Sequence, residues 1–311
     1  MKKVSMVKLA SDYLAKRRTL GFALRNEGQL LLQFARYADG RAPGRALTLK
    51  LQVQWARLPR GVSPACWAHR LKVLRPFVKY RAAFDPRTEV APNGYLGRAY
   101  GRTTPYIYPE SEIAALIRAA KQLRPQAGLR PRTYATLLGL LACTGLRISE
   151  ALQLHQADVD LAQGVLVIRH GKFKRDRLVP LHPSAVKALK AYQQARDQRI
   201  AAEYFFVSEH GQPLPISTVE GTFRKLVQKA LPNAASGKGR PRLHDLRHTA
   251  ATRRLLAWSR QGRSPDTTLL FLSKYLGHQR VRDTYWYFSG VPELFHQVGK
   301  QFGRFVRALQ P

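Results

Sequence analysis

The chain has 311 residues, enough for two domains and a sizeable buried core. Its 53 lysines and arginines outnumber its 19 aspartates and glutamates, so its formal net charge at pH 7 is +34, with a sequence pI of about 11.0. Such a charge favours a polyanion as the partner, and nucleic acid is the commonest one. The longest apolar stretch, residues 137–143, is too short to cross a bilayer, which argues against a membrane protein.

Cysteine usage and the first residues indicate the compartment. Cys66 and Cys143 are too few for a disulfide framework and too isolated for a zinc site. Residues 1–5 carry positive charge with no apolar segment behind them, so we expect no secretory signal. We therefore expect a cytoplasmic protein. Cys143 lies in the apolar stretch, and we expect it in the core.

Residues 1–92 predict a small, all-helical, basic domain. Apolar residues recur at helical spacing within residues 5–38, 48–57 and 64–83. Pro76 lies inside the last of these helices and is expected to kink it or divide it in two. Five basic residues of that helix are expected on its outer face: Arg70, Lys72, Arg75, Lys79 and Arg81. The net charge favours phosphate contacts for much of this face over simple solvation.

A linker and a second domain are expected to follow. Residues 93–109 are rich in Pro, Gly, Tyr and Arg without periodicity, which is typical of a linker. Residues 110–290 form the second domain, which begins with a helix carrying Glu110 and Glu112 in its first turn. Residues 291–311 predict a last helix with an apolar stripe that must be buried.

The second domain contains an arginine in an unusual position. A leucine-rich helix over about 131–143 leads through a Thr-Gly turn to Arg147, which we expect in the first turn of the next helix. Free backbone N–H groups there favour an anion, whereas a positive charge opposes the helix dipole. A bound phosphate or a salt bridge to Glu150 would each explain the arginine, and the local sequence favours neither.

A β-hairpin with a basic tip is expected next. Residues 164–169 and 176–181 alternate apolar with polar and enclose a basic segment that contains Lys172. A lysine at such a tip is usually solvated, but beside a phosphate pocket its ammonium could donate a proton to a leaving oxygen. Helices are expected over residues 183–200 and 216–230.

Residues 243–290 contain a set of groups suited to phosphate chemistry. His244 and Arg247 are three positions apart, so on a helix they share a face. A guanidinium holds phosphate oxygens in a fork, and an imidazole moves a proton near neutral pH. His278, Tyr285 and Tyr287 follow, and a phenol can attack phosphorus and carry it covalently. The His-x-x-Arg spacing alone is a weak signal, since most such pairs are solvated helix faces.

Taken together, these segments resemble the tyrosine recombinase (phage integrase) family. The resemblance covers about residues 108–290 and rests on motifs in the family's order and separation: Thr144–Glu150, Gly171-Lys172 followed by Arg177–Leu181, His244–Thr249, Leu276–His278 and a tyrosine nine positions after His278. It implies a mainly α fold with a small antiparallel β-sheet (α+β). The helical N-terminal domain is similar to the family's core-binding domain.

The resemblance also implies roles for the conserved groups of the family. Arg147 and Arg247 would clamp the scissile phosphate of DNA, and His244 would accept and donate a proton. A phosphodiester gains a second negative charge on the way to its five-coordinate transition state, so two fixed arginines stabilise that state more than the ground state. No cofactor, metal ion or ATP is then expected.

Lys172 would act as the general acid for the departing 5′ oxygen, and His278 would support the phosphate and the nucleophile's proton. Tyr287 would attack and form a 3′-phosphotyrosyl link. Tyr285 lies nearby, but on a helix the two tyrosines would point to nearly opposite faces. The offset from His278 favours Tyr287, and Tyr285 is expected to pack in the core.

We therefore expect a site-specific recombinase that acts on double-stranded DNA as a dimer on one site and a tetramer in synapsis. Residues 291–311 would dock on the neighbouring protomer or in cis. The sequence context resembles integrases of mobile elements more than housekeeping members, and residues 258–268 form a longer, more basic segment than in Xer-type members. The alternatives are a type IB topoisomerase and a noncatalytic DNA-binding regulator with the same fold.

Overall fold

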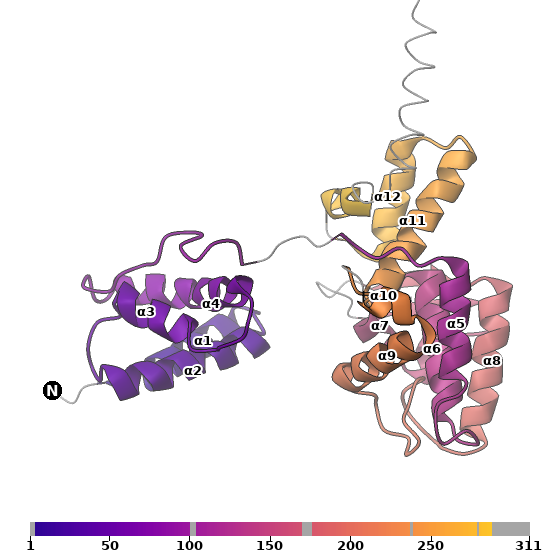
Figure 1. The fold of residues 1–311 in the computed structure, drawn as a ribbon, viewed down its shortest axis with the longest axis horizontal. Coiled ribbons are helices and arrows are strands. Elements are labelled where there is room, and N and C mark those ends of the chain that lie inside the picture. The colour runs from indigo at the N-terminus through magenta and orange to yellow at the C-terminus, as the bar shows by residue number, and fades with distance from the viewer. Residues whose placement is uncertain (1–3, 100–103, 170–175, 237–238, 279, 288–311) are drawn as a thin grey trace, which may run out of the picture. The chain divides into compact units, whose positions relative to one another are not determined.

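The computed structural model describes residues 4–99, 104–169, 176–236, 239–278 and 280–287. The chain folds into two compact units, Met1–Thr103 and Thr104–Pro311, both drawn in Figure 1. Residues 104–109, which lie inside the predicted linker, are grouped with the second unit. Tyr108 accounts for this grouping, because it is fully buried there and its hydroxyl donates to the Arg242 carbonyl (2.9 Å).

The first unit is all-helical within its described residues. Its helices are α1 (Met6–Thr19), α2 (Arg25–Arg41), α3 (Leu49–Ala56) and α4 (Pro64–Ala82). Ser5 and Thr48 cap α1 and α3, because their hydroxyl oxygens accept hydrogen bonds from backbone amides of the first turns. The largest fully buried side chains of its core are aromatic or leucine: Phe34, Leu47, Trp55, Leu74 and Phe77. The predicted helical N-terminal fold is therefore confirmed.

Helix α4 differs from its prediction in two respects. Pro76 does not divide it, because the helix runs unbroken from Pro64 to Ala82. Arg70 and Arg75, expected on the outer face, are half-buried. The Arg70 guanidinium lies 3.8 Å from the centre of the Trp55 ring, and Arg75 Nε donates to the Ala91 carbonyl (2.9 Å). These two arginines stabilise the first unit itself.

The second unit is mainly helical within its described residues. Its α-helices are α5 (Glu110–Ala120), α6 (Arg130–Thr144), α7 (Ile148–Leu152), α8 (Pro183–Asp197), α9 (Ile216–Ala230), α10 (Pro232–Ser236), α11 (Asp245–Arg260) and α12 (Pro265–Leu276). Short 3-10 helices are η1 (Gln156–Asp158), η2 (Val281–Asp283) and η3 (Tyr285–Tyr287), and the strands are β1 (Val159–Asp160), β2 (Val165–Ile168) and β3 (Arg177–Pro180).

The strands form an antiparallel sheet in the order β1-β2-β3. Leu166 of β2 pairs with Val179 of β3, and both are fully buried. Leu178, the residue before Val179 on β3, is exposed. This alternation packs one face of the sheet on the core and leaves the other to solvent. The predicted hairpin is therefore present. Its tip, with Lys172, lies outside the described residues.

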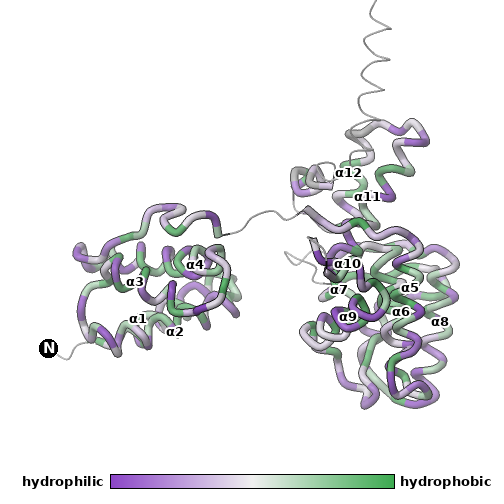
Figure 2. Tube along the Cα trace, viewed as in Figure 1, coloured by the Kyte–Doolittle hydropathy of each residue, from purple (hydrophilic) through white to green (hydrophobic). Residues whose placement is uncertain are grey.

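Helix α6 is part of the core of the second unit and packs against α5, α8 and α11. Figure 2 shows hydrophobic residues concentrated in α5 and α6. Cys143, expected in that core, is exposed. It lies on the less buried stripe of α6 with Arg132, Thr136 and Gly139, at the i, i+4, i+7, i+11 spacing of one helix face. The prediction was wrong because it followed the apolar run and not the helical period within it.

Across the described residues no helix is long and apolar enough to cross a membrane. The predicted C-terminal helix, residues 291–311, lies outside the described part of the chain.

Candidate active site

Five of the six predicted site residues lie in the described part of the second unit. Arg147 is the N-cap of α7, one residue before the predicted first turn. His244 is the N-cap of α11, and Arg247 lies in the first turn of that helix. His278 follows α12, and Tyr287 ends η3. The ends of four helices therefore carry the site.

Arg247 is almost completely enclosed, with 2% of its surface exposed. Its guanidinium donates to the carbonyls of Gly145 (2.7 Å) and Leu276 (2.6 Å), at the C-terminal ends of α6 and α12. Carbonyls at a helix C-terminus carry partial negative charge, so they compensate the buried cation. Burial lowers the pKa of Arg247, and the nearby Tyr287 hydroxyl and Glu150 carboxylate oppose that shift.

Arg147 and Arg177 share one carboxylate, that of Glu150. Glu150 Oε1 accepts from Arg147 Nη1 (2.6 Å) and from Arg177 Nη1 (3.1 Å), and Oε2 accepts from Arg177 Nη2 (2.8 Å). Burial raises the pKa of Glu150, but its hydrogen bonds and the charges of the two arginines outweigh burial and lower the pKa to about 2. The salt bridge that the sequence left as one alternative for Arg147 is thus present, and Arg177 adds a second one.

Two glycines in the left-handed region bring the backbone close to these arginines. Gly145 (φ +66°) ends α6, and Gly277 (φ +67°) ends α12. A Cβ on Gly277 would lie 2.8 Å from Arg177 Nη1, and a Cβ on Gly145 would lie 3.2 Å from Ala250 Cβ. The Gly277 carbonyl also accepts from Arg147 Nη2 (3.2 Å). Glycine suits both the turn and the close approach.

His278 is oriented by a hydrogen bond at each ring nitrogen. Arg247 Nη2 donates to His278 Nε2 (3.1 Å), so this nitrogen carries no proton. The ring proton therefore lies on Nδ1, which donates to Thr284 Oγ1 (2.8 Å). Burial and the charges of Arg247 and Arg147 lower the pKa of His278 to about 4, so the ring is neutral at pH 7.

The two tyrosines of η3 differ in burial. Tyr287 is 5% exposed, and its ring stacks nearly parallel to that of His278, with centroids 5.8 Å apart. Tyr285 is 52% exposed. The prediction that Tyr285 packs in the core was therefore wrong, because residues two apart in a 3-10 helix point in different directions and only one of them faces the core.

His248 lies between the rings of His244 and Tyr287. The His248 ring lies 5.2 Å from that of His244 and 5.1 Å from that of Tyr287, between centroids. Burial lowers the pKa of His248 to about 4 and, together with the charge of Arg247, lowers the pKa of His244. His248 Nδ1 is buried without a hydrogen-bond partner. The neutral imidazoles of His248 and His278 therefore both lie beside the Tyr287 ring.

The structure thus brings together the predicted residues that it describes, and it adds others: Glu150, Arg177, His248 and Thr284. Arg177 belongs to a motif recognised in the sequence, but its position on a strand did not indicate that its side chain contacts Glu150 of α7. Among the described residues, no group of three or more His, Cys, Asp or Glu side chains is placed to hold a metal ion. Three arginines against one glutamate give a net positive site suited to an oxyanion.

Comparison with known proteins identifies the family. Residues 108–291 match the sequence profile of the phage integrase family. The protein y4rB of Sinorhizobium fredii, named as an integrase/recombinase, is 39% identical over 300 residues, which cover 94% of this chain and 95% of y4rB. The tyrosine recombinase XerC of Chlamydia caviae is 30% identical over 223 residues, which cover 69% of this chain and 64% of XerC.

The solved structures agree at the level of the fold. The Tn1549 transposon integrase, solved in complex with transposon right end DNA, is similar over 97% of this chain and 100% of its own, with a TM-score of 0.70 and 16% identity. This similarity confirms the expected helical fold with a small antiparallel sheet. Because the family profile covers more than half of the sequence and y4rB aligns with almost all of it, the chain belongs to the phage integrase family of tyrosine recombinases.

Proposed function

We propose that this chain cleaves and rejoins duplex DNA through a covalent bond between Tyr287 and a 3′ phosphate. The observation that carries the proposal is the meeting of the buried Tyr287 with the buried guanidinium of Arg247, which itself donates to His278. A tyrosine that only packs in a core has no need of a buried arginine beside its hydroxyl, as Tyr287 has in Arg247. A phenol beside fixed positive charge suits reaction with an anionic centre.

The proposed reaction exchanges one phosphate ester for another. The Tyr287 oxygen forms a bond to phosphorus while the bond from phosphorus to the 5′ oxygen breaks. The tyrosine loses its proton and the 5′ oxygen gains one, for which we propose Lys172 as the donor. The products are a 3′-phosphotyrosyl link and a free 5′-hydroxyl. Attack by a 5′-hydroxyl reverses the step, so rejoining does not require ATP.

Arg147 and Arg247 would hold the non-bridging oxygens of the phosphate. Their guanidinium groups are already fixed by helix-end carbonyls and by Glu150, so little reorganisation is needed when the phosphate arrives. The charge that develops in the transition state then meets preplaced donors. These arginines and Lys172 would supply the charge stabilisation for which other enzymes use a divalent ion.

Neutral imidazoles would accept the proton that the tyrosine loses and later return it. The lowered pKa values of His244 and His278 keep both rings neutral at pH 7, and only a neutral ring accepts a proton. The His278 ring lies parallel to the Tyr287 ring, and its unprotonated Nε2, which accepts from Arg247, is the atom that would exchange this partner for the tyrosine proton. His244 is proposed to accept and donate a proton at the phosphate.

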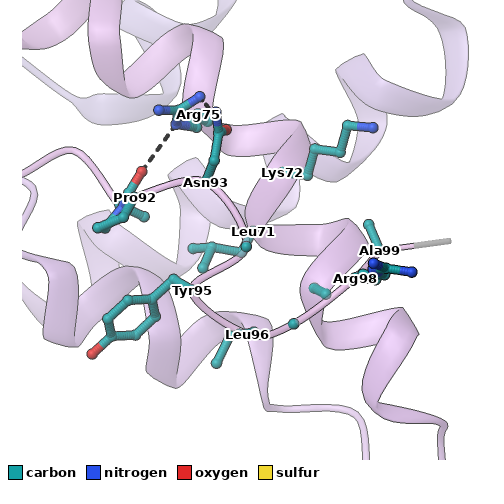
Figure 3. Close-up of a pocket in the computed structure, with 13 residues that line it drawn as sticks. Leu71, Lys72, Arg75, Pro92, Asn93, Tyr95, Leu96, Arg98 and Ala99 are labelled. Atoms are coloured by element: carbon teal, nitrogen blue, oxygen red, sulfur yellow. Dashed lines mark hydrogen bonds between the residues drawn. The ribbon is translucent and has the colours of Figure 1, made fainter.

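The proposed substrate is double-stranded DNA, bound by both units. The net charge of +34 supports this, as does the similarity to an integrase solved with transposon DNA. The first unit contributes a pocket of about 390 Å³ where α4 meets residues 91–99. Lys72 and Arg98 both line it, and Figure 3 shows the Lys72 side chain extending away from α4. Lys72 and Arg98 are therefore proposed phosphate contacts.

Recombination joins two sites, so we propose a dimer on each site and a tetramer in synapsis. In this proposal residues 1–92 and 110–290 bind the DNA. Residues 93–109 connect them, with residues 104–109 packed in the second unit, and residues 291–311 dock on the neighbouring protomer or in cis. Its proposed location is the cytoplasm. We propose an integrase of a mobile element, and the full-length similarity to y4rB, named as an integrase/recombinase, supports the integrase part of this proposal.

The test uses a pool of nicked duplexes with randomised sequence. Cleavage next to the nick releases a short fragment that diffuses away, so the covalent product accumulates. We expect DNA that remains bound to the full chain after denaturation in SDS, and sequencing that DNA identifies the site. Strand exchange between two such duplexes identifies a recombinase. Relaxation of supercoiled DNA without exchange would indicate a topoisomerase, and DNA binding without a covalent product would indicate a regulator.

A further inference from the structure

We infer that Arg177 is a positioning residue, which shares the Glu150 carboxylate with Arg147 so that the group of three side chains keeps a net positive charge. The inference rests on the proposed function, in which Arg147 binds the scissile phosphate. It adds to that function a residue of β3 that does not itself touch the phosphate.

The Arg177 side chain joins β3 to two other elements of the site. Its Nε donates to the Tyr275 carbonyl in the last turn of α12 (2.9 Å). Its Nη1 and Nη2 donate to the two oxygens of Glu150 on α7 (3.1 and 2.8 Å). The side chains of Arg177 and Glu150 are only 12% and 5% exposed. A buried two-point contact of this kind fixes both the position and the orientation of the carboxylate.

The charges explain why this contact matters for phosphate binding. Glu150 also accepts from Arg147 twice, from Nη1 (2.6 Å) and from the backbone amide (2.9 Å). A buried pair of Glu150 and Arg147 alone would have no net charge, whereas the three residues together have a net charge of +1. A neutral buried pair attracts a phosphate far less than a positive group does. Arg177 thereby preserves the positive charge that Arg147 presents.

The backbone around Arg177 leaves room for its guanidinium. Gly277 has a positive φ (+67°), and a Cβ there would lie 2.8 Å from Arg177 Nη1 and 3.1 Å from its Cζ. The carbonyl of the same glycine accepts from Arg147 Nη2 (3.2 Å). Arg147 is thus held by Glu150 and Gly277, and Arg177 lies against both. Its loss would disturb both supports of Arg147 at once.

The test is a double-mutant cycle of Arg177→Gln and Glu150→Gln in the full chain. Arg177→Gln leaves Glu150 paired with Arg147 alone, and we expect adduct formation to slow by about 10- to 100-fold. The double variant removes the carboxylate as well, and we expect it to be at least about tenfold faster than Arg177→Gln. Arg169→Gln breaks an ion pair with Asp158 beside β2, and as the matched control it should leave the rate unchanged.

If Arg177 had only a structural role, the double-mutant cycle would give a different result. The double variant would then be as slow as Arg177→Gln or slower, and this would overturn the inference. Thermal unfolding of each variant shows whether the comparison is made on folded protein. If Arg177→Gln does not fold, the same cycle is run on Arg177→Lys, which keeps the charge without the fork and should show a smaller loss and a smaller recovery.

A second measurement does not depend on cleavage. The Nε–H signal of Arg147 in protein labelled with ¹⁵N-arginine, identified by its loss in Arg147→Lys, is titrated with inorganic phosphate. We expect phosphate to shift this signal in the wild type and in the double variant but not in Arg177→Gln. Equal shifts in wild type and Arg177→Gln would overturn the inference. A wild type that binds phosphate in this way but forms no DNA adduct would overturn the proposed function and leave the role of Arg177 standing.

Discussion

Replacing Gly277 by alanine tests how closely the backbone of the site is fitted to its arginines. The φ of +67° costs an alanine about 1–2 kcal/mol of folding free energy. The new Cβ would lie 2.8 Å from Arg177 Nη1, so that guanidinium must shift. Losing one of its charge-assisted hydrogen bonds to Glu150 costs about 1.5–3 kcal/mol more. The expected total loss of stability is therefore about 2.5–5 kcal/mol.

Gly262 provides a matched control in the loop between α11 and α12. Its φ is +70°, but a Cβ there would meet no atom within 4 Å. Gly262→Ala should therefore show only the backbone cost of about 1–2 kcal/mol. The difference between the two variants, about 1.5–3 kcal/mol, isolates the contact with Arg177.

Urea unfolding of both variants, followed by tryptophan fluorescence, measures the two losses of stability. The rate of covalent adduct formation on trapped DNA gives a second comparison. We expect Gly277→Ala to slow adduct formation, because the supports of Arg147 shift, and Gly262→Ala to leave it unchanged. Equal stability losses and equal rates in the two variants would show that Gly277 serves only the turn, and the fitted arrangement of Arg177 and Arg147 would be refuted.

Three further predictions concern pH, the arginines and salt. His248 and His278 have pKa values lowered from 6.5 to about 4, so stability should fall as the pH decreases through this range, by up to about 1.4 kcal/mol per pH unit for each ring. Urea unfolding at pH 7.5 and pH 5 checks this, and equal stabilities would contradict it. Arg147→Ala and Arg247→Ala should each slow adduct formation roughly 100- to 1,000-fold in single-turnover assays, and near-normal rates would remove them from the site. DNA affinity should fall by about 10³ or more between 50 and 200 mM salt, whereas a flat dependence would argue against phosphate contacts.

The sequence predicted those parts of the site that depend on short-range signals. Gly145 and Gly277 end α6 and α12, and the residues that follow them place Arg147 at the start of α7 and His278 directly after α12. His244 and Arg247 are three positions apart and begin one helix, which brings both to the same end of α11. Local turn and capping chemistry places such residues, so their spacing along the chain is informative.

Contacts that cross between elements could not be predicted in the same way. The pairing of Arg177 with Glu150 joins β3 to α7, and the spacing of a strand residue does not reveal its partner. His248 beside Tyr287 depends on the packing of η3 on α11. The exposure of Cys143 could have been predicted from the sequence, because the helical period of α6 places it on the same face as polar or small residues. The tight turn that exposes Tyr285 depends on the fold and not on residue type.

Identification of the residue that carries the DNA is the most direct measurement of the central claim. DNA trapped on the full chain is trimmed by nuclease, and the modified peptide is found by mass spectrometry. We expect the phosphate on Tyr287, no adduct with Tyr287→Phe despite near-normal DNA binding, and retained adduct with Tyr285→Phe. A phosphate found on Tyr285, or an adduct that survives in Tyr287→Phe, would contradict the claim that Tyr287 is the nucleophile.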